Sequence, residues 1–358
     1  MLETKEKKII IFAAGTGGHI YPGISIAKEL IKNNIKILWI GTVKGMENKI
    51  LSDTNIDIKH IDFSGIRGKG IIPIIKLPFR LIKAIIQAFI IIKKYNPNLV
   101  LSMGGYISVP CCIASYILRK PIFIHEQNII FGLANNILKI LSKKIILGMP
   151  LKINNKKYKY IGNPTRYEKI ITKKKFHEKR EINLLVVGGS LGAKVFNEII
   201  PRAIYLLNKT LDLELNVIHQ AGKTSTIAKD QYNNTDVQFE VKEYVNSMKE
   251  AYEWCDIIIC RGGAITISEL MVFGVPAIIV PYPYATDDHQ MKNSRYLESK
   301  EAAIVIDQEN FTETYLAKIL KSLIENSKIR KTLSENIFSL NKKNITKSIC
   351  NLILDEIN

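Results

Sequence analysis

The sequence predicts an α/β protein with two Rossmann-like domains, each built on a doubly wound parallel sheet. Short, continuous apolar runs that end in glycine-rich loops alternate with helix-like stretches, which is typical of parallel strands covered on both faces. The pattern begins at residues 9–13 and restarts at residues 181–192, which indicates two similar halves. At 358 residues the chain is also longer than one hydrophobic core usually supports.

The expected strands of the first half are short, apolar and closed by glycine or polar residues. They lie in residues 9–13, 35–41, 56–63, 99–106, 121–124 and 143–148. Pro22 and Pro110 each stand where a helix following a glycine loop would begin. Residues 160–166 contain Gly and Pro and predict the crossing between the domains.

The second half repeats this order of elements. Its expected strands lie in residues 181–192, 214–222, 237–245, 256–264 and 275–281. A short helix is expected over residues 266–273, and two or three helices from residue 312 to the end. We therefore expect domains at residues 1–162 and 163–340 facing a cleft, with residues 341–358 forming a helix that packs back toward the first domain.

Bulk properties exclude several classes of protein. Acidic residues near the N-terminus predict that there is no signal peptide, and the apolar stretches are too short to cross a membrane. Five cysteines without metal-binding spacing indicate reduced, mostly buried thiols. No basic motif is interleaved with aromatic residues, so we expect no nucleic acid partner.

Positive charge is concentrated in the first half. Up to residue 163 there are 25 Lys and Arg against 8 Asp and Glu, a net charge of +17, whereas the remainder has 26 against 25, a net charge of +1. This asymmetry predicts that the first half faces something anionic. The candidates are nucleic acid, which the missing basic and aromatic motif argues against, a phospholipid surface or a charged substrate.

The first glycine loop predicts an anion site. Gly15, Gly17 and Gly18 allow the backbone to approach a ligand closely, and the N-terminus of the following helix would present amide groups to it. A tight turn that binds nothing is the alternative. His19 is not explained by phosphate binding alone.

A basic loop at residues 64–70 precedes a helix-like stretch at residues 71–95. Lys76, Arg80 and Lys83 fall on one stripe, and Phe79 with several isoleucines covers the rest. This pattern is typical of a helix that lies on an anionic membrane surface, although a core helix with one solvated face fits equally well.

Together these motifs resemble the MurG family of UDP-N-acetylglucosamine transferases in order and spacing over nearly the whole chain. The motifs are Gly15–His19, Ser64–Gly70, Met103–Tyr106, His125–Asn128, Gly162–Arg166, Gly188–Ala193, Arg261–Ala264 and Asp287–Gln290. One departure is Gly262, where many members of that family have Ser or Ala, so a hydroxyl contact to the donor would be lost.

The resemblance implies a GT-B fold whose second half binds the donor UDP-GlcNAc and whose first half binds the acceptor lipid I, undecaprenyl-pyrophosphoryl-MurNAc-pentapeptide. It implies transfer of GlcNAc to the 4-hydroxyl of MurNAc with inversion, which forms lipid II. It also implies peripheral attachment to an anionic phospholipid surface, the cytoplasmic face of the inner membrane. UDP-GlcNAc would be a substrate, and no cofactor or bound metal is expected.

The resemblance also implies roles for single residues. His19 is the candidate general base and Glu126 the alternative, while in a third interpretation His19 only hydrogen-bonds the donor. The expected donor-binding residues are Thr16, Gly17, Gly18, Asn128, Arg166, Ser190, Leu191, Gly192, Val245, Glu269 and Gln290. Ser190 and the amides of Leu191 and Gly192, at a helix N-terminus, are expected to hold the diphosphate, and the backbone of Val245 is expected to contact the uracil. Glu269 is expected to accept from the ribose hydroxyls, or alternatively to complement a helix dipole. The expected acceptor-binding residues are Gly15, Gly104, Gly105 and Tyr106, and Tyr106 packing in the core is equally compatible. Lys76, Phe79, Arg80 and Lys83 are expected to face the membrane.

Three other functions are compatible with the same sequence features. A GT-B transferase that acts on diacylglycerol, a UDP-GlcNAc 2-epimerase and a non-catalytic scaffold at the membrane would share much of this architecture. The epimerase would have no use for a basic apolar helix at residues 71–95, and the intact set of candidate site residues argues against a scaffold.

Overall fold

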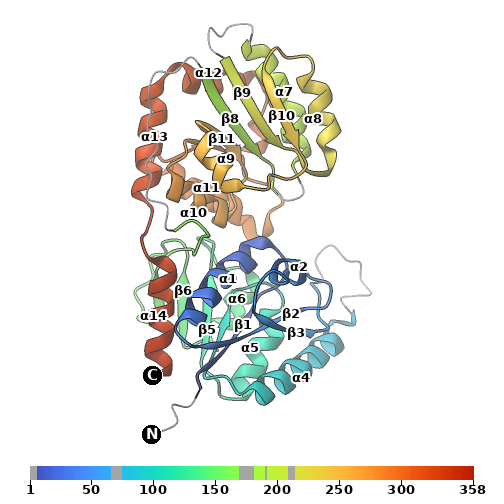
Figure 1. The fold of residues 1–358 in the computed structure, drawn as a ribbon, viewed down its shortest axis with the longest axis vertical. Coiled ribbons are helices and arrows are strands. Elements are labelled where there is room, and N and C mark those ends of the chain that lie inside the picture. Colours follow the sequence, from blue (N-terminus) through green and yellow to red (C-terminus); the bar gives the residue numbers. More distant parts are fainter. Residues whose placement is uncertain (1–5, 66–74, 169–180, 190–191, 209–213) are drawn as a thin grey trace. The chain divides into compact units, whose positions relative to one another are not determined.

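The computed structural model describes residues 6–65, 75–168, 181–189, 192–208 and 214–358, which form two compact units (Figure 1). The first unit comprises the chain up to Glu168 together with Lys342–Asn358, and the second comprises Lys169–Asn341. Each contains a parallel β-sheet, so the predicted fold class is confirmed. The first unit continues past residue 162, where we expected the division.

The sheet of the first unit has, within the described residues, the strand order β3-β2-β1-β4-β5-β6-β7. The strands are β1 (Lys8–Phe12), β2 (Lys36–Thr42), β3 (Asp57–Ile61), β4 (Leu99–Ser102), β5 (Ile122–Glu126), β6 (Lys144–Leu147) and β7 (Tyr158–Tyr160). The central strand β1 is covered on both faces, since Ile9 and Ile11 belong to one apolar cluster and Ile10 and Phe12 to another. A strand with no solvated face requires the continuous apolar run seen in the sequence.

Helices cover both faces of this sheet. They are α1 (Gly17–Lys32), α2 (Glu47–Leu51), α4 (Leu77–Tyr95), α5 (Ser108–Ile117), α6 (Leu133–Leu138) and α14 (Ile345–Ile357). The C-terminal helix α14 packs beside α1, and its Ile349 and Ile353 are buried in the cluster that contains Ile9 (Figure 1). On the other face, α4 and α5 contribute Ala84, Ala88 and other residues to the cluster around Phe12.

Two helices begin earlier than the prolines predicted. The carbonyl oxygen of Thr16 accepts hydrogen bonds from the amides of His19 and Ile20, at 3.1 and 3.4 Å, so α1 begins at Gly17 and Pro22 lies inside it. A proline inside a helix removes one backbone donor without preventing the turns before it. Helix α5 likewise begins at Ser108, ahead of Pro110.

The sheet of the second unit has, among the described residues, the order β10-β9-β8-β11-β12-β13. Its strands are β8 (Glu181–Val187), β9 (Glu214–Gln220), β10 (Gln238–Lys242), β11 (Ile257–Cys260), β12 (Ala277–Ile279) and β13 (Ile304–Val305). Its helices are α7 (Lys194–Asn208), α8 (Ser225–Tyr232), α9 (Met248–Trp254), α10 (Ala264–Phe273), α11 (His289–Glu298), α12 (Glu313–Glu325) and α13 (Ser327–Ser339), with short 3₁₀ turns at Gly222–Thr224, Thr286–Asp288 and Gln308–Asn310. The two strands that the sequence did not predict, β7 and β13, are only three and two residues long and carry no readable pattern.

The cysteines and the apolar helices were the subject of two further predictions. All five cysteines are free and buried, as predicted. Within the described part of the chain, no helix combines the length and the apolar character needed to cross a membrane.

Two buried histidines make stability depend on pH. Burial lowers the pKa of His125 from 6.5 to about 4 and the pKa of His219 to about 3. The unfolded chain binds these protons below pH 6.5 and the folded chain does not, so this contribution to stability is fully present above pH 6.5 and is lost as the pH falls toward 4. We expect the free energy of unfolding, measured with urea, to decrease by up to about 1.4 kcal/mol per pH unit for each histidine.

His219→Gln should reduce this pH dependence, whereas the same change at the exposed His60 should leave it intact. Equal free energies of unfolding at pH 7.5 and pH 5 would show that the histidines are not held neutral.

Candidate active site

The first glycine loop leads into the N-terminus of α1. Gly15 has a φ of +102°, and Thr16 is extended, with φ −107° and ψ 158°, at the N-cap position. The first turn of α1 contains no acidic residue. The leading amide groups of the helix, which include those of Gly17 and Gly18, therefore form a positive end that suits an anion.

His19 lies in this first turn and is held by the neighbouring loop. Its Nδ1 is 2.9 Å from the carbonyl oxygen of Met103, the residue after β4. A carbonyl oxygen cannot donate, so Nδ1 carries the hydrogen and the neutral ring has its lone pair on Nε2. The tautomer of His19 is thus set by a backbone group.

The second glycine loop, which follows Met103, is shaped around this imidazole. Gly104 and Gly105 have φ values of +94° and +79°. A Cβ atom on Gly104 would lie 3.2 Å from Cε1 and Nδ1 of His19, and one on Gly105 would lie 3.1 Å from the carbonyl oxygen of Ala14. Two predicted motifs therefore meet, and both glycines are required by backbone conformation and by space.

Tyr106 lies beside the same two loops. Its ring is 3.7 Å from the position of a Cβ on Gly15 and 3.3 Å from that of a Cβ on Gly65, and its centroid is 6.2 Å from that of Phe63. The predicted acceptor-binding residues Gly15, Gly104, Gly105 and Tyr106 are thus gathered around His19.

Glu126, at the end of β5, is buried and surrounded by donors. One carboxylate oxygen accepts from the backbone amide and the Nδ2 of Asn128, at 3.0 and 3.1 Å. The other accepts from the amide of Gly132 at 3.1 Å and from the Nδ2 of Asn135 at 2.9 Å. Both oxygens are engaged, so Glu126 holds the loop that carries Asn128 in place.

Arg166 also belongs to the first unit, where it lies close to the start of α1. Its guanidinium is stacked over the ring of Tyr21, 4.2 Å from the centroid, and lies 5.4 Å from that of Tyr167. The Tyr21 ring in turn is 3.0 Å from the position of a Cβ on Gly17. This geometry places a permanent positive charge beside the helix N-terminus.

The glycine loop of the second unit follows β8. Ser190 and Leu191, both predicted to bind the donor, lie outside the described residues. The amide of Gly192, which we expect to help hold the diphosphate, donates to the carbonyl oxygen of Gly189 at 3.0 Å, and α7 begins at Lys194. A Cβ on Gly192 would lie 2.1 Å from the carbonyl oxygen of Ala221, so only glycine fits there.

Gln220 is a site residue that was not predicted from the sequence. Its Nε2 donates to the carbonyl oxygen of Gly189 at 2.8 Å, and its Oε1 accepts from the amide of Val245 at 3.0 Å. Val245 is predicted to contact uracil through its backbone, and its amide is thus already bound, which leaves its carbonyl for that contact. A polar residue at the carboxyl end of β9 was the available signal.

Two more predicted donor residues are held by hydrogen bonds in the second unit. Glu269 is nearly buried on α10, where it accepts from the hydroxyl of Tyr252 at 2.9 Å. Since α10 begins at Ala264, Glu269 lies beyond the first turn, which disfavours the alternative that it serves the helix dipole. Gln290, on α11, accepts from the amide of Tyr282 through Oε1 at 3.0 Å.

Gly262 is also explained by packing. A Cβ atom there would lie 2.4 Å from Oγ of Ser294 and 2.5 Å from the carbonyl oxygen of Gln290. Helix α11 therefore approaches too closely for Ser or Ala, so the departure from the family pattern is a local packing feature of this chain.

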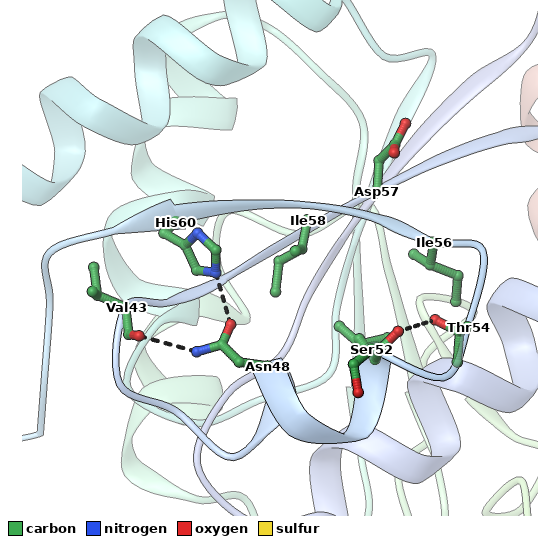
Figure 2. A pocket seen from close by; sticks show the side chains of 9 residues that line it. Val43, Asn48, Ser52, Thr54, Ile56, Asp57, Ile58 and His60 are labelled. Carbon is green, nitrogen blue, oxygen red and sulfur yellow. Dashed lines mark hydrogen bonds between the residues drawn. The ribbon is translucent and has the colours of Figure 1, made fainter.

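Other features of the described residues do not contribute to this site. The surface hollow in Figure 2 lies between α2 and β3, where Nε2 of His60 and Oδ1 of Asn48 are 2.7 Å apart, and no predicted site residue lines it. No three His, Cys, Asp or Glu side chains of the described chain are grouped so that they could hold a metal ion.

The close contact at Gly104 can be tested by adding a single methyl group. Gly104→Ala should lower the free energy of unfolding by about 1–3 kcal/mol, because it combines a positive φ with a contact on His19. Gly132→Ala is the matched control, since a Cβ there meets nothing within 4 Å, and it should stay within about 0.5 kcal/mol of the parent. Equal urea midpoints for the two variants would show that neither the backbone conformation at Gly104 nor its contact with His19 requires glycine.

Known glycosyltransferases match this chain over nearly its whole length. The glycosyltransferase family 28 N-terminal domain matches residues 9–147, and the glycosyltransferase family 28 C-terminal domain matches residues 183–349. The chain is 40% identical over 352 residues to the "UDP-N-acetylglucosamine--N-acetylmuramyl-(pentapeptide) pyrophosphoryl-undecaprenol N-acetylglucosamine transferase" of Haemophilus ducreyi, covering 96% of each chain. It is 39% identical over 334 residues to the protein of the same name from Psychromonas ingrahamii, covering 92% of this chain and 93% of that one.

Solved structures also match this chain over nearly its whole length. The crystal structure of Acinetobacter baumannii MurG matches with a TM-score of 0.81 and 32% identity, covering 98% of this chain and 99% of that one. A UDP-N-acetylglucosamine 2-epimerase from Listeria monocytogenes matches with a TM-score of 0.69 at 12% identity, which shows a shared fold alone. On these identities the chain belongs to the MurG family of N-acetylglucosamine transferases, within glycosyltransferase family 28.

Proposed function

We propose that this chain transfers GlcNAc from UDP-GlcNAc to the 4-hydroxyl of the MurNAc unit of lipid I, and so forms lipid II. The observation that carries the proposal is full-length identity of 33–40% to transferases whose names state this donor and a muramyl pyrophosphoryl-undecaprenol acceptor. The grouping of His19 with both glycine loops of the first unit supports it.

The proposed reaction is an inverting displacement. The hydroxyl oxygen of the acceptor forms a bond to the anomeric carbon of GlcNAc while the bond from that carbon to UDP breaks. The electron pair of the broken bond leaves with UDP, the configuration changes from α to β, and the hydroxyl proton passes to a base. The site must therefore supply a base, positive charge near the diphosphate and a fixed orientation.

His19 is the base that the geometry favours. Its Nδ1 donates to the carbonyl oxygen of Met103, so the lone pair of the neutral ring is on Nε2, the atom that would take the proton. The two carboxylate oxygens of Glu126 already accept four N–H hydrogen bonds, a setting that suits a structural carboxylate better than a proton acceptor.

The other predicted site residues bind the donor and the acceptor in our proposal. In our proposal the α1 N-terminus with Thr16, Gly17, Gly18 and Arg166 offers positive electrostatics to the departing diphosphate, which removes the need for a bound metal. Glu269 accepts from the ribose hydroxyls, and Val245 contacts the uracil through its carbonyl. The roles of Ser190, Leu191, Gly192, Asn128 and Gln290 at the donor rest on the family resemblance, as do those of Gly15, Gly104, Gly105 and Tyr106 at the acceptor.

The transfer itself is the test. Purified protein should move labelled GlcNAc from UDP-GlcNAc to a short-chain lipid I analogue, with and without EDTA. His19→Ala should lower kcat by about 10²–10⁴-fold because the base is lost. Glu126→Gln, which keeps the shape of the side chain, should have the smaller effect on kcat and should act mainly through the position of Asn128.

Two results would change the proposal. Turnover on diacylglycerol together with none on the lipid I analogue would show that diacylglycerol, not lipid I, is the acceptor. Loss of activity in EDTA would show that the reaction needs a bound metal ion. An unchanged kcat in His19→Ala would move the base to Glu126.

We also propose that α4 meets an anionic phospholipid surface. Large apolar residues are exposed along one side of this helix and just before it, and Phe79 and Ile75 are 77% and 68% exposed. The further exposed members are Ile82, Ile86 and Ile90. Such a continuous apolar row on a surface helix is typical of an interfacial helix.

Two cations of the predicted stripe on α4 have partners within the first unit. Lys83 forms an ion pair of 2.7 Å with Asp62, and the guanidinium of Arg80 donates to Oγ of Ser64 at 2.6 Å. These two cations are therefore engaged by the residues after β3, and the apolar row carries more of the proposed contact. In our proposal this contact is with the cytoplasmic face of the inner membrane, to which the protein attaches peripherally, as the family resemblance implies.

Vesicle binding tests the apolar contribution. Phe79→Ser combined with Ile86→Ser should weaken co-sedimentation with phosphatidylglycerol vesicles at least about tenfold, because each buried large apolar side chain contributes about 1.5–3 kcal/mol. Val43→Ser, at an equally exposed site on the same unit, should have no effect. The double variant should still transfer GlcNAc to a soluble short-chain acceptor. If it bound vesicles as well as the parent protein does, α4 would serve only to cover the core of the first unit.

A further inference from the structure

A single backbone oxygen connects the predicted base to a buried polar cluster. The carbonyl oxygen of Met103 accepts from Nδ1 of His19 at 2.9 Å and from Nε2 of Gln127 at 2.8 Å. A carbonyl oxygen has two lone pairs, so these two donors fill it. The direction of this carbonyl decides whether Nδ1 or Nε2 of His19 carries the hydrogen, and Gln127 is the second group that fixes that direction.

The orientation of the Gln127 amide is itself determined. Its Nε2 also lies 3.0 Å from Nδ1 of His125. The Nε2 of His125 donates to the carbonyl oxygen of Gly162 at 3.2 Å, so Nδ1 of this neutral ring is an acceptor. Both hydrogens of the Gln127 amide group therefore have acceptors, and turning the amide over would place two oxygens against each other.

The cluster is enclosed and anchored at its far end. His125 and Gln127 are 0% and 2% exposed. The Nδ2 of Asn163 donates to the backbone carbonyl of Gln127 at 3.0 Å, and a Cβ on Gly148 would lie 1.9 Å from the Oδ1 of Asn163. Burial lowers the pKa of His125 to about 4, which keeps it neutral near pH 7. A protonated His125 would present an N–H to the Gln127 amide and break the chain of hydrogen bonds.

We propose that Gln127 is a positioning residue for His19, which it holds in the tautomer with hydrogen on Nδ1 by donating to the shared carbonyl oxygen of Met103. The proposal rests on the proposed role of His19 as the base. Gln127 itself does not touch the reacting atoms.

The stability cost of Gln127 supports a functional role. Its Oε1 is buried without a hydrogen-bond partner among the described residues. A buried acceptor left without a donor costs about 1–3 kcal/mol. Gln127→Met removes this unpaired Oε1 but leaves Nδ1 of His125 without its donor, so the two effects on stability oppose each other. We therefore expect Gln127→Met to change the thermal midpoint by only a few degrees.

The tautomer can be read directly by NMR in protein labelled with ¹⁵N-histidine, with His19→Gln assigning the signals. In the parent protein at pH 8, His19 should show hydrogen on Nδ1, and hydrogen on Nε2 would overturn the proposal without any variant. In Gln127→Met the His19 signals should move toward a mixture of tautomers. Gln127→Glu, which keeps the shape and loses both donors, serves as a second variant if the first fails to fold.

Kinetics supply the second measurement. In Gln127→Met, kcat should fall about tenfold, while KM for UDP-GlcNAc should stay within about threefold, because a misoriented base affects the chemical step. Asn183→Leu is the matched control, since its Nδ2 donates to a backbone carbonyl, that of Trp254, in the second unit, and it should change neither kcat nor the His19 signals.

Unchanged His19 signals in a folded variant would overturn the proposal whatever the kinetics. Shifted signals with an unchanged kcat would overturn its catalytic consequence. If the parent protein transferred no GlcNAc, the proposed function would fail, and the NMR result would still decide whether Gln127 holds His19.

Discussion

The candidate site depends on the parallel pairing of β1 with β4. The register joins Phe12 to Ser102, so the two glycine loops leave the sheet side by side at its carboxyl edge. The amide of Met103 then donates to the carbonyl oxygen of Phe12 at 2.9 Å, and the carbonyl oxygen of Met103 meets His19. Because strands of a parallel sheet end at the same edge, a local pairing of backbones brings together residues that are 84 positions apart.

This edge combines apolar support with buried polar groups. The apolar clusters on the two faces of β1 hold the sheet, while the end of β5 places His125, Glu126 and Gln127 in the interior. Buried polar side chains are tolerated when their hydrogen bonds are satisfied, and most of those in this cluster are. A cluster of this kind allows few alternative arrangements, which is the property that a base and its orienting groups require.

Much of the fold and part of the site were predictable from the sequence. The continuous apolar runs predicted buried parallel strands, and the glycines after β1 and β4 predicted the two loops that meet at His19. The prolines were misleading about helix starts, since a carbonyl such as that of Thr16 can start a helix several residues before Pro22. The shortest strands, β7 and β13, carry too few residues to show a pattern.

The sequence by itself determined which chemical groups this protein has and where along the chain they stand, because apolar periodicity and glycine positions are local properties. Only the tertiary structure decided how those groups are used. Glu126 is occupied by four donors, Lys83 is paired with Asp62, and Gln127 shares an oxygen with His19. Each of these outcomes depends on contacts between segments that are not adjacent in the sequence or on which side of a loop a side chain faces, and neither is encoded in a local pattern.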